Sequence, residues 1–265
     1  MKEKLQKIAF DLFGLVGKFP TALTDQSDVR SLLRKLRPRL TNFELIRLGP
    51  GGDGGYLVPN DLDNIDACFS PGVSDISGFE KDCAENGMQV FMADKSVAGP
   101  AESHERFDFV RKYIGALSND EFMTLDDWVG ASLKTSTSDL LLQMDIEGAE
   151  YETILATSPG LMQRFRVIVV EFHQVQFLWS HPFFQIASRA FEKILQTHTC
   201  VHIHPNNCCG SVVKGDIQLP RVMEFTFLRS DRINTSSPAL IFPHPLDANN
   251  LAGETLQLPP CWYQD

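Results

Sequence analysis

The sequence has no apolar stretch of the roughly 20 residues that a membrane-spanning helix requires. It also lacks a surplus of positive charge, because 34 Asp and Glu outnumber 24 Lys and Arg and give a net charge of −10. A surface of that sign repels polyphosphates, which argues against a protein that binds nucleic acid. Internal repeats and low-complexity segments are absent, and the composition excludes disordered, collagen-like and coiled-coil proteins.

The N-terminus lacks the features of a cleaved secretory signal. Lysines precede an apolar run, but Asp11 and Gly14 interrupt that run, and no small-residue cleavage site follows it. The apolar residues between Leu5 and Val16 recur instead at helical spacing, which predicts a helix with one apolar stripe. We expect this helix to pack on the domain or on a second copy of the chain, giving a homo-oligomer, rather than on a membrane surface.

The six cysteines lack the spacing of a disulfide framework. Together with the missing signal, this predicts a reduced, cytoplasmic protein. His202, His204, Cys208 and Cys209 form a cluster that resembles zinc ligands, but no second cysteine pair accompanies it. Chance proximity is therefore the preferred interpretation.

Predicted strands alternate with predicted helices from about residue 66 onward. This alternation predicts an α/β fold in which helices cover both faces of a parallel sheet. We expect one globular domain with three parts: an N-terminal helical extension over residues 1–45, a cofactor-binding domain over 46–230 and a wrapping tail over 231–265. The expected strands are Asp66–Ser70, Gln89–Ala93, Phe107–Ile114, Leu140–Met144, Arg166–Val170, Thr199–His204 and a late antiparallel strand, Val222–Arg229.

Polar or glycine residues follow the strands of the first part of this sheet: Gly72–Asp75, Asp94–Lys95, Asp145–Glu150 and Glu171–His173. In such sheets ligands bind at the carboxyl ends of the strands. Gly72 allows a ligand close to the backbone, and Asp94 follows about 20 residues later, where an acidic residue accepts hydrogen bonds from a ribose. The pair favours a bound nucleoside.

The run Asp145-Ile-Glu-Gly-Ala-Glu150, followed by Glu171-Phe-His173, resembles the signature of the FkbM-type family of S-adenosylmethionine-dependent O-methyltransferases. The likeness covers roughly Arg47 to Arg229. It implies a Rossmann-like sheet of the class I methyltransferase type, with seven mostly parallel strands and an antiparallel last strand. It also implies a methyl transfer to a hydroxyl of a saccharide or another small polar metabolite.

The resemblance implies a set of cofactor-binding residues. Gly72, Ser74 and Asp75 would lie near the methionine part of S-adenosylmethionine, with Asp94 and the adjoining Lys95 at the ribose. Residues 118–122, including Asp120, would line the adenine. Asp53 or Tyr56, beside a glycine-rich loop, could close over the site. The first turn departs from the common methyltransferase pattern, since Pro71 and Ser74 replace a denser glycine run.

We expect His173 or Asp145 to act as the base, because both follow neighbouring strands and an alcohol is a poor nucleophile at neutral pH. Glu171 and Glu147 would orient them or the acceptor. His204 and Asn206 either contact the acceptor or are satisfied loop groups. A magnesium ion held by Asp145, Glu171 and His173 could replace the base, but a base without metal is preferred.

Two other classes of function remain open. One is a catalytically silent cofactor-binding or scaffold protein that assembles through its N-terminal helix. The other is a metal-dependent hydrolase that uses Asp145, Glu171 and His173, with His202 and His204. The sequence has no motif of a hydrolase nucleophile, so the hydrolase ranks last.

Overall fold

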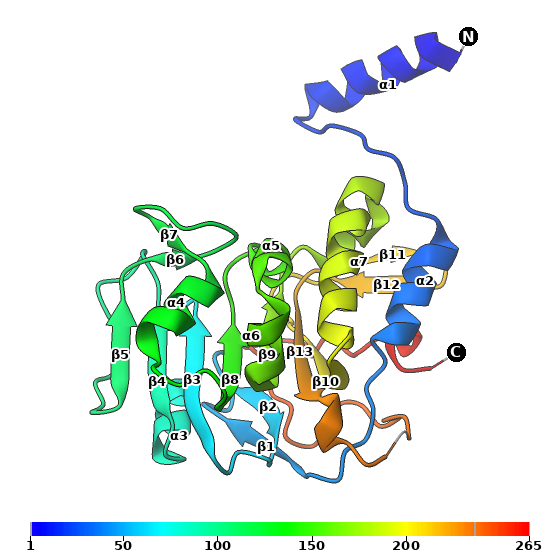
Figure 1. Cartoon of the computed structure of the whole chain (residues 1–265). Helices are drawn as coiled ribbons and strands as arrows, with labels where there is room; N and C mark the ends of the chain where they lie inside the picture. The colour runs from blue at the N-terminus through cyan, green and yellow to red at the C-terminus, as the bar shows by residue number, and fades with distance from the viewer. Residues whose placement is uncertain (1, 236, 265) are drawn as a thin grey trace.

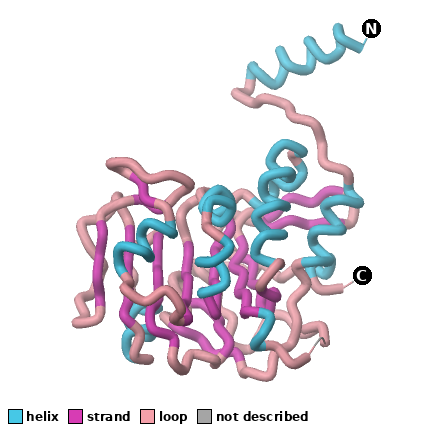
Figure 2. The backbone as a smooth tube through the Cα atoms, in the orientation of Figure 1, coloured by secondary structure: helices cyan, strands magenta, loops and turns pink. Residues whose placement is uncertain are grey.

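A seven-stranded sheet runs through the computed structural model, which describes residues 2–235 and 237–264 (Figure 1, Figure 2). The strand order is β10–β13–β9–β8–β3–β4–β5. Neighbouring strands are parallel except at β13, which lies antiparallel to both β9 and β10. The predicted α/β fold, with a mostly parallel sheet and an antiparallel last strand, is therefore confirmed. The strands are β3 (Ile65–Pro71), β4 (Gln89–Ala93), β5 (Phe107–Val110), β8 (Asp139–Met144), β9 (Phe165–Phe172), β10 (His198–Pro205) and β13 (Met223–Arg229).

The central strands are largely apolar because both faces of the sheet are covered. All residues of β9 are buried, as are all residues of β8 after Asp139. A strand that is buried on both sides shows a continuous apolar run rather than an alternating one. This property made Leu140–Met144 and Arg166–Val170 recognisable in the sequence.

Different elements cover the two faces of the sheet. One face packs against five helices: α2 (Gln26–Lys35), α4 (Leu125–Ser132), α5 (Glu150–Ala156), α6 (Pro159–Arg164) and α7 (His181–Leu195). The other face packs against α3 (Gly78–Glu85) and an antiparallel pair, β1 (Leu45–Leu48) and β2 (Tyr56–Pro59). The smaller elements are β6 (Tyr113–Ile114), β7 (Phe122–Met123), β11 (Ser211–Lys214), β12 (Ile217–Pro220), η1 (Val175–Trp179), η2 (Ser230–Arg232) and η3 (Pro260–Trp262).

Helix α1 (Lys2–Leu15) projects away from the rest of the chain (Figure 1). The predicted helix is present, but its apolar residues do not pack on the domain. Leu12 is 60% exposed and Leu15 is 82% exposed. The expectation that this helix packs on its own domain is therefore wrong, because the segment that follows it leads away from the sheet. Pairing with a second copy stays a prediction.

Segments that precede and follow the central sheet in the sequence lie together beside it. Arg39 pairs with Pro238 in an isolated bridge, and the amide of Arg39 donates to the carbonyl of Cys200 in β10. Trp262 is fully buried and donates from Nε1 to the carbonyl of Gln218 over 3.0 Å. Segments before and after the central sheet therefore cover its β10 edge. The three-part division of the chain stays a prediction.

His198, at the start of β10, makes stability depend on pH. Its Nε2 lies 2.6 Å from the carbonyl oxygen of Phe165, to which it can only donate, and burial lowers its pKa to about 4. Below about pH 6.5 the imidazole of His198 is protonated in the unfolded chain but stays neutral in the native chain. The stability that this group contributes is complete above pH 6.5 and is lost as the pH falls towards 4, by about 3 kcal/mol in total.

We therefore expect the difference in unfolding free energy between the wild type and His198→Gln to shrink between pH 7 and pH 4.5. Urea unfolding at several pH values measures this difference. Gln163→Ala, at an exposed position of α6 without a titratable group, is the control and should differ from the wild type by a constant amount. A constant difference for His198→Gln as well would contradict the assignment.

Candidate active site

A cavity of about 690 Å³ lies at the carboxyl ends of β3, β4 and β8. After β3 the chain builds β4 and β5 on one side and later β8 and β9 on the other, so the strand order reverses between β3 and β8. Ligands of open α/β sheets bind at this reversal, and pockets of about 300–1,000 Å³ accommodate small molecules. The cavity is lined by Gly72, Val73, Ser74, Asp75, Ala93, Asp94, Ser96, Val97, Tyr113, Ile114, Phe122, Asp145, Ile146, Glu147 and Ala149.

Gly72 is required by the backbone at the floor of this cavity. Its φ is +90°, and a Cβ at this position would stand 1.5 Å from the carbonyl oxygen of Asp145. The amide of Gly72 donates to the carbonyl of Ala93, and the amide of Asp145 donates to that of Pro71. The three strand ends are therefore joined by backbone contacts that leave no room for a side chain.

Asp94 of the predicted ribose region lines the same cavity, as does Phe122, the only residue of the predicted adenine region 118–122 among the lining residues. Tyr113, which the sequence did not suggest, lines it as well. Oδ1 of Asp94 accepts hydrogen bonds from the amide and hydroxyl of Ser96, each 2.6 Å long, which fixes the carboxylate at the end of β4. Tyr113 and Phe122 come from the small parallel pair β6–β7, with ring centroids 5.5 Å apart. Their rings offer apolar surfaces of the kind on which a base stacks.

Four predicted cofactor residues do not line the cavity. Lys95 pairs with the carboxylate of Glu121, and Asp120 is exposed on the same loop. Tyr56 is buried in β2, edge-on to Phe79, rather than on a mobile loop, because the apolar residues 56–58 form a strand. Asp53 lies close to Asn250 of the C-terminal segment instead.

The three predicted catalytic residues come together beside the cavity. One ligand atom from each of Asp145, Glu171 and His173 lies within 4.8 Å of the others. Nε2 of His173 is 3.9 Å from Oδ1 of Asp145 and 3.7 Å from Oε1 of Glu171. It is also 3.4 Å from Glu147, whose side chain is 86% exposed. We refer to Asp145, Glu171 and His173 as the acidic cluster.

Glu150 orients His173, a role that the sequence did not suggest. Its fully buried carboxylate accepts hydrogen bonds from the amides of Ile146 and Gly148 and lies 3.1 Å from Nδ1 of His173. The turn that makes this possible has positive φ at both Glu147 and Gly148. Glu150 thus holds the turn before α5 and fixes the imidazole with the same carboxylate oxygen.

Burial and mutual repulsion shift the proton affinities in the acidic cluster. Burial raises the pKa of Asp145 to about 7, with His173 opposing the shift and Glu147 and Glu150 adding to it. Burial, followed by the charge of Asp145, raises the pKa of Glu171 to about 10. Burial opposes the charged form of His173, but the bond to Glu150 and the nearby carboxylates outweigh it and raise its pKa. With a pKa of about 7, Asp145 can exchange a proton near neutral pH, whereas Glu171 keeps its proton there.

A comparison with protein families finds a match in the central part of the chain. The model of the methyltransferase FkbM domain matches residues 73–198. This part of the chain is therefore similar to a methyltransferase FkbM domain. This range includes the strand ends that carry Asp94, Asp145 and His173, so the resemblance found in the sequence is confirmed.

A solved structure with partial similarity to this chain is a candidate methyltransferase of an antibiotic biosynthesis pathway from Anabaena variabilis. It is 12% identical, with a TM-score of 0.28, and the match covers 53% of this chain and 60% of that chain. The comparison with curated proteins found no match. Among residues 2–235 and 237–264, no helix has the length and apolarity needed to cross a membrane.

Of the two predicted acceptor residues, Asn206 contacts the acidic cluster, and neither lines the cavity. Nδ2 of Asn206 donates to Oε1 of Glu171 over 3.2 Å. His204 is buried, and its Nδ1 lies 3.5 Å from Oδ2 of Asp247. Nδ2 of Asn250 donates to Glu224, which lies opposite Glu171 in the sheet. Asp247 and Asn250 both belong to the C-terminal segment, and nothing in the sequence indicated that they lie near the site.

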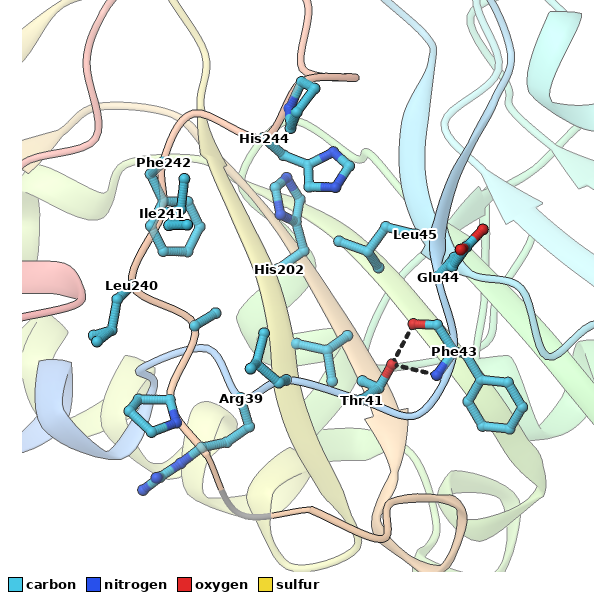
Figure 3. Close-up of a pocket in the computed structure, with 15 residues that line it drawn as sticks. Arg39, Thr41, Phe43, Glu44, Leu45, His202, Leu240, Ile241, Phe242 and His244 are labelled. Atoms are coloured by element: carbon cyan, nitrogen blue, oxygen red, sulfur yellow. Dashed lines mark hydrogen bonds between the residues drawn. The ribbon is translucent and has the colours of Figure 1, made fainter.

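A second cavity, of about 600 Å³, lies between segments 39–45 and 238–245 beside β10 (Figure 3). Its lining is largely apolar, and His202 and His244 face each other at one end. Nε2 of His202 is 2.9 Å from Oδ1 of Asp247, while Cys208 and Cys209 are exposed. Within the described chain these histidines and cysteines do not form a metal-ligand group, and all six cysteines are free.

Proposed function

We propose that this chain transfers a methyl group from S-adenosylmethionine to a hydroxyl of a saccharide or another small polar metabolite. The observation that carries the proposal is the acidic cluster at the wall of the cavity: Asp145 both lines the cavity and contacts His173. A methyl donor in the cavity and an acceptor at the cluster would then be neighbours. The saccharide acceptor rests on the family resemblance, together with the polar groups of Glu171 and Asn206.

The residues of the cavity fit the cofactor. Gly72 lets a ligand approach the backbone, and the carboxylate of Asp94 is at the strand end where a ribose is bound in related sheets. Tyr113 and Phe122 offer the rings for an adenine, while Ser74 and Asp75 lie near the other end of the lining. The carboxylates of Asp145 and Glu147 favour a positively charged sulfonium nearby.

S-adenosylmethionine would supply the methyl group for an in-line displacement, in which the acceptor oxygen would bond to the methyl carbon and the electron pair of the broken carbon–sulfur bond would go to the sulfur. Asp145 or His173 would take the hydroxyl proton of the acceptor. Alignment of the reactants can supply about 7–11 kcal/mol of the barrier, and a positioned proton acceptor adds typically about 10²–10⁴-fold. Most of the catalysis would thus come from positioning.

The cofactor is tested by calorimetric titration with S-adenosylmethionine and S-adenosylhomocysteine. We expect both to bind, and we expect Asp94→Asn to weaken their binding by about tenfold or more, because two ribose hydroxyls lose a charged acceptor. Asp108→Asn, an exposed carboxylate on the neighbouring strand β5, should bind like the wild type. Absence of binding to the wild type would exclude the methyltransferase and favour the hydrolase; binding without turnover of any acceptor would favour the scaffold protein.

Three predictions from the sequence accompany this proposal. They are a cytoplasmic location, pairing of two copies through α1, and the division into residues 1–45, 46–230 and 231–265. The six free cysteines and the exposed apolar residues of α1 support the first two.

A further inference from the structure

The acidic cluster gathers two carboxyl groups around one imidazole. Two further buried carboxyl groups lie beside it: Glu150 bonds to His173, and Glu224 lies opposite Glu171 in the sheet. Among the described residues, His173 is the only cationic side chain that forms an ion pair with Asp145 or Glu171. Oxygen and nitrogen ligands grouped in this way, with few partners of their own, favour a bound cation.

Two carboxylate oxygens of the cluster are buried and have no hydrogen-bond partner. They are Oδ1 of Asp145 and Oε2 of Glu171. Glu171 is only 5% exposed, and its carboxylate faces the imidazole of His173. Nearly all buried polar atoms in proteins are satisfied, so two such atoms in one cluster indicate a missing ligand.

The hydrogen bond of His173 fixes which nitrogen faces the cluster. Nδ1 is 3.1 Å from a carboxylate oxygen of Glu150, and that oxygen also accepts two backbone amides. Nδ1 therefore carries a hydrogen, and Nε2 presents its lone pair to the carboxylates of Asp145 and Glu171 when the ring is neutral. A carboxylate that holds the far nitrogen of an imidazole is the arrangement that supports metal-binding histidines.

We propose that Asp145, Glu171 and His173 form a binding site for a divalent cation. An ion with bonds of about 2.1–2.4 Å places neighbouring ligand atoms about 3–4 Å apart. Here the distances from Nε2 of His173 to the two carboxylates are 3.9 Å and 3.7 Å. Two carboxylates and one imidazole, without cysteine, suit Mn²⁺ or Mg²⁺.

The cation site corresponds to the alternative to a base that works without metal. Its use in catalysis rests on the proposed function, but binding of the ion does not. Since Asp145 also lines the cavity, the site adjoins the cavity in which we propose that the methyl donor binds. A bound ion would orient the acceptor hydroxyl and lower its pKa.

The test is a titration of the metal-free full chain with Mn²⁺ alone, followed by electron paramagnetic resonance and competition with Mg²⁺. We expect one Mn²⁺ per chain and at least 100-fold weaker binding by Glu171→Gln, which keeps the size of the side chain. Asp94→Asn is the matched control on another strand end and should retain Mn²⁺ affinity within twofold. A wild type that binds no Mn²⁺, or a Glu171→Gln variant that binds it equally well, would overturn the proposal.

A second variant and a second measurement keep the outcome interpretable. His173→Gln should also weaken Mn²⁺ binding, and circular dichroism establishes that each variant is folded. Without metal, Glu171→Gln should melt at a higher temperature than the wild type, because it removes a buried, repelled carboxyl group. Calorimetry with S-adenosylhomocysteine is independent of these results, so failure of the cation site and failure of the methyltransferase are distinguishable.

Discussion

Replacing Asp145 by asparagine should lower the rate of methyl transfer by about 10²–10⁴-fold and leave cofactor affinity within a few fold. Asp145 is the residue that connects the cavity to His173, and asparagine keeps its shape while removing its charge. The effect follows whether the carboxylate takes the hydroxyl proton or holds a cation that activates the hydroxyl. Because the change acts on the reacting oxygen, it should lower kcat rather than cofactor binding.

Transfer of labelled methyl groups to a panel of mono- and disaccharides measures this rate, and calorimetry with S-adenosylhomocysteine measures the affinity. Asp66→Asn is the control, since Asp66 is an exposed residue of β3 outside the cavity. Activity of Asp145→Asn within threefold of the wild type would remove Asp145 from the mechanism. Loss of activity on treatment with a chelator, restored by Mn²⁺, would assign the effect to the cation.

The position of the site could be predicted because a parallel sheet collects its strand ends at one edge. Asp94, Asp145, Glu171 and His173 each follow a strand, and the apolar runs before them are long enough to identify those strands. Once the strands are known, the proximity of these side chains is a consequence of topology rather than of any single motif. The same reasoning located Gly72 at the turn after β3.

Contacts made by turns and distant segments could not be predicted. Ser77 and Glu80 have the spacing of a capping box, yet Ser77 accepts a hydrogen bond from Ala101, and Glu80 accepts one from Ser70. By contrast, Thr124 caps α4 by accepting a hydrogen bond from the amide of Asp127. Local spacing fixes a cap only when no partner from another element competes for the same group.

The bond between Glu150 and His173 depends on the two positive φ angles after β8, which the sequence suggests only at Gly148. The pairing of Asp247 with His204 joins residues 43 positions apart. Neither the hydrophobic periodicity nor a motif spacing in the sequence links Asp247 to His204. The path of the C-terminal segment is set by the surface of the sheet and loops that it covers. The sequence therefore identified the carboxylates at the strand ends but not the groups that orient them.

Gly72→Ala should be the most damaging single-atom change at the site. The new Cβ would lie 1.5 Å from the carbonyl oxygen of Asp145, which is backbone and cannot turn away, and φ at this position is +90°. Strand ends β3 and β8 would have to separate at the floor of the cavity. We expect the unfolding free energy to fall by about 3 kcal/mol or more and S-adenosylhomocysteine affinity to fall at least 100-fold.

Gly87→Ala separates the effect of backbone strain from that of the steric clash. Gly87 has almost the same φ, +92°, but no atom lies within 4 Å of the added carbon. It should cost about 1 kcal/mol from backbone strain alone and should not change cofactor binding. Urea unfolding and calorimetry on both variants measure the contrast. A Gly72→Ala variant that is as stable as Gly87→Ala and binds the cofactor normally would contradict the close contact between the ends of β3 and β8. The cavity between these strand ends would then lack the shape on which the cofactor assignment depends.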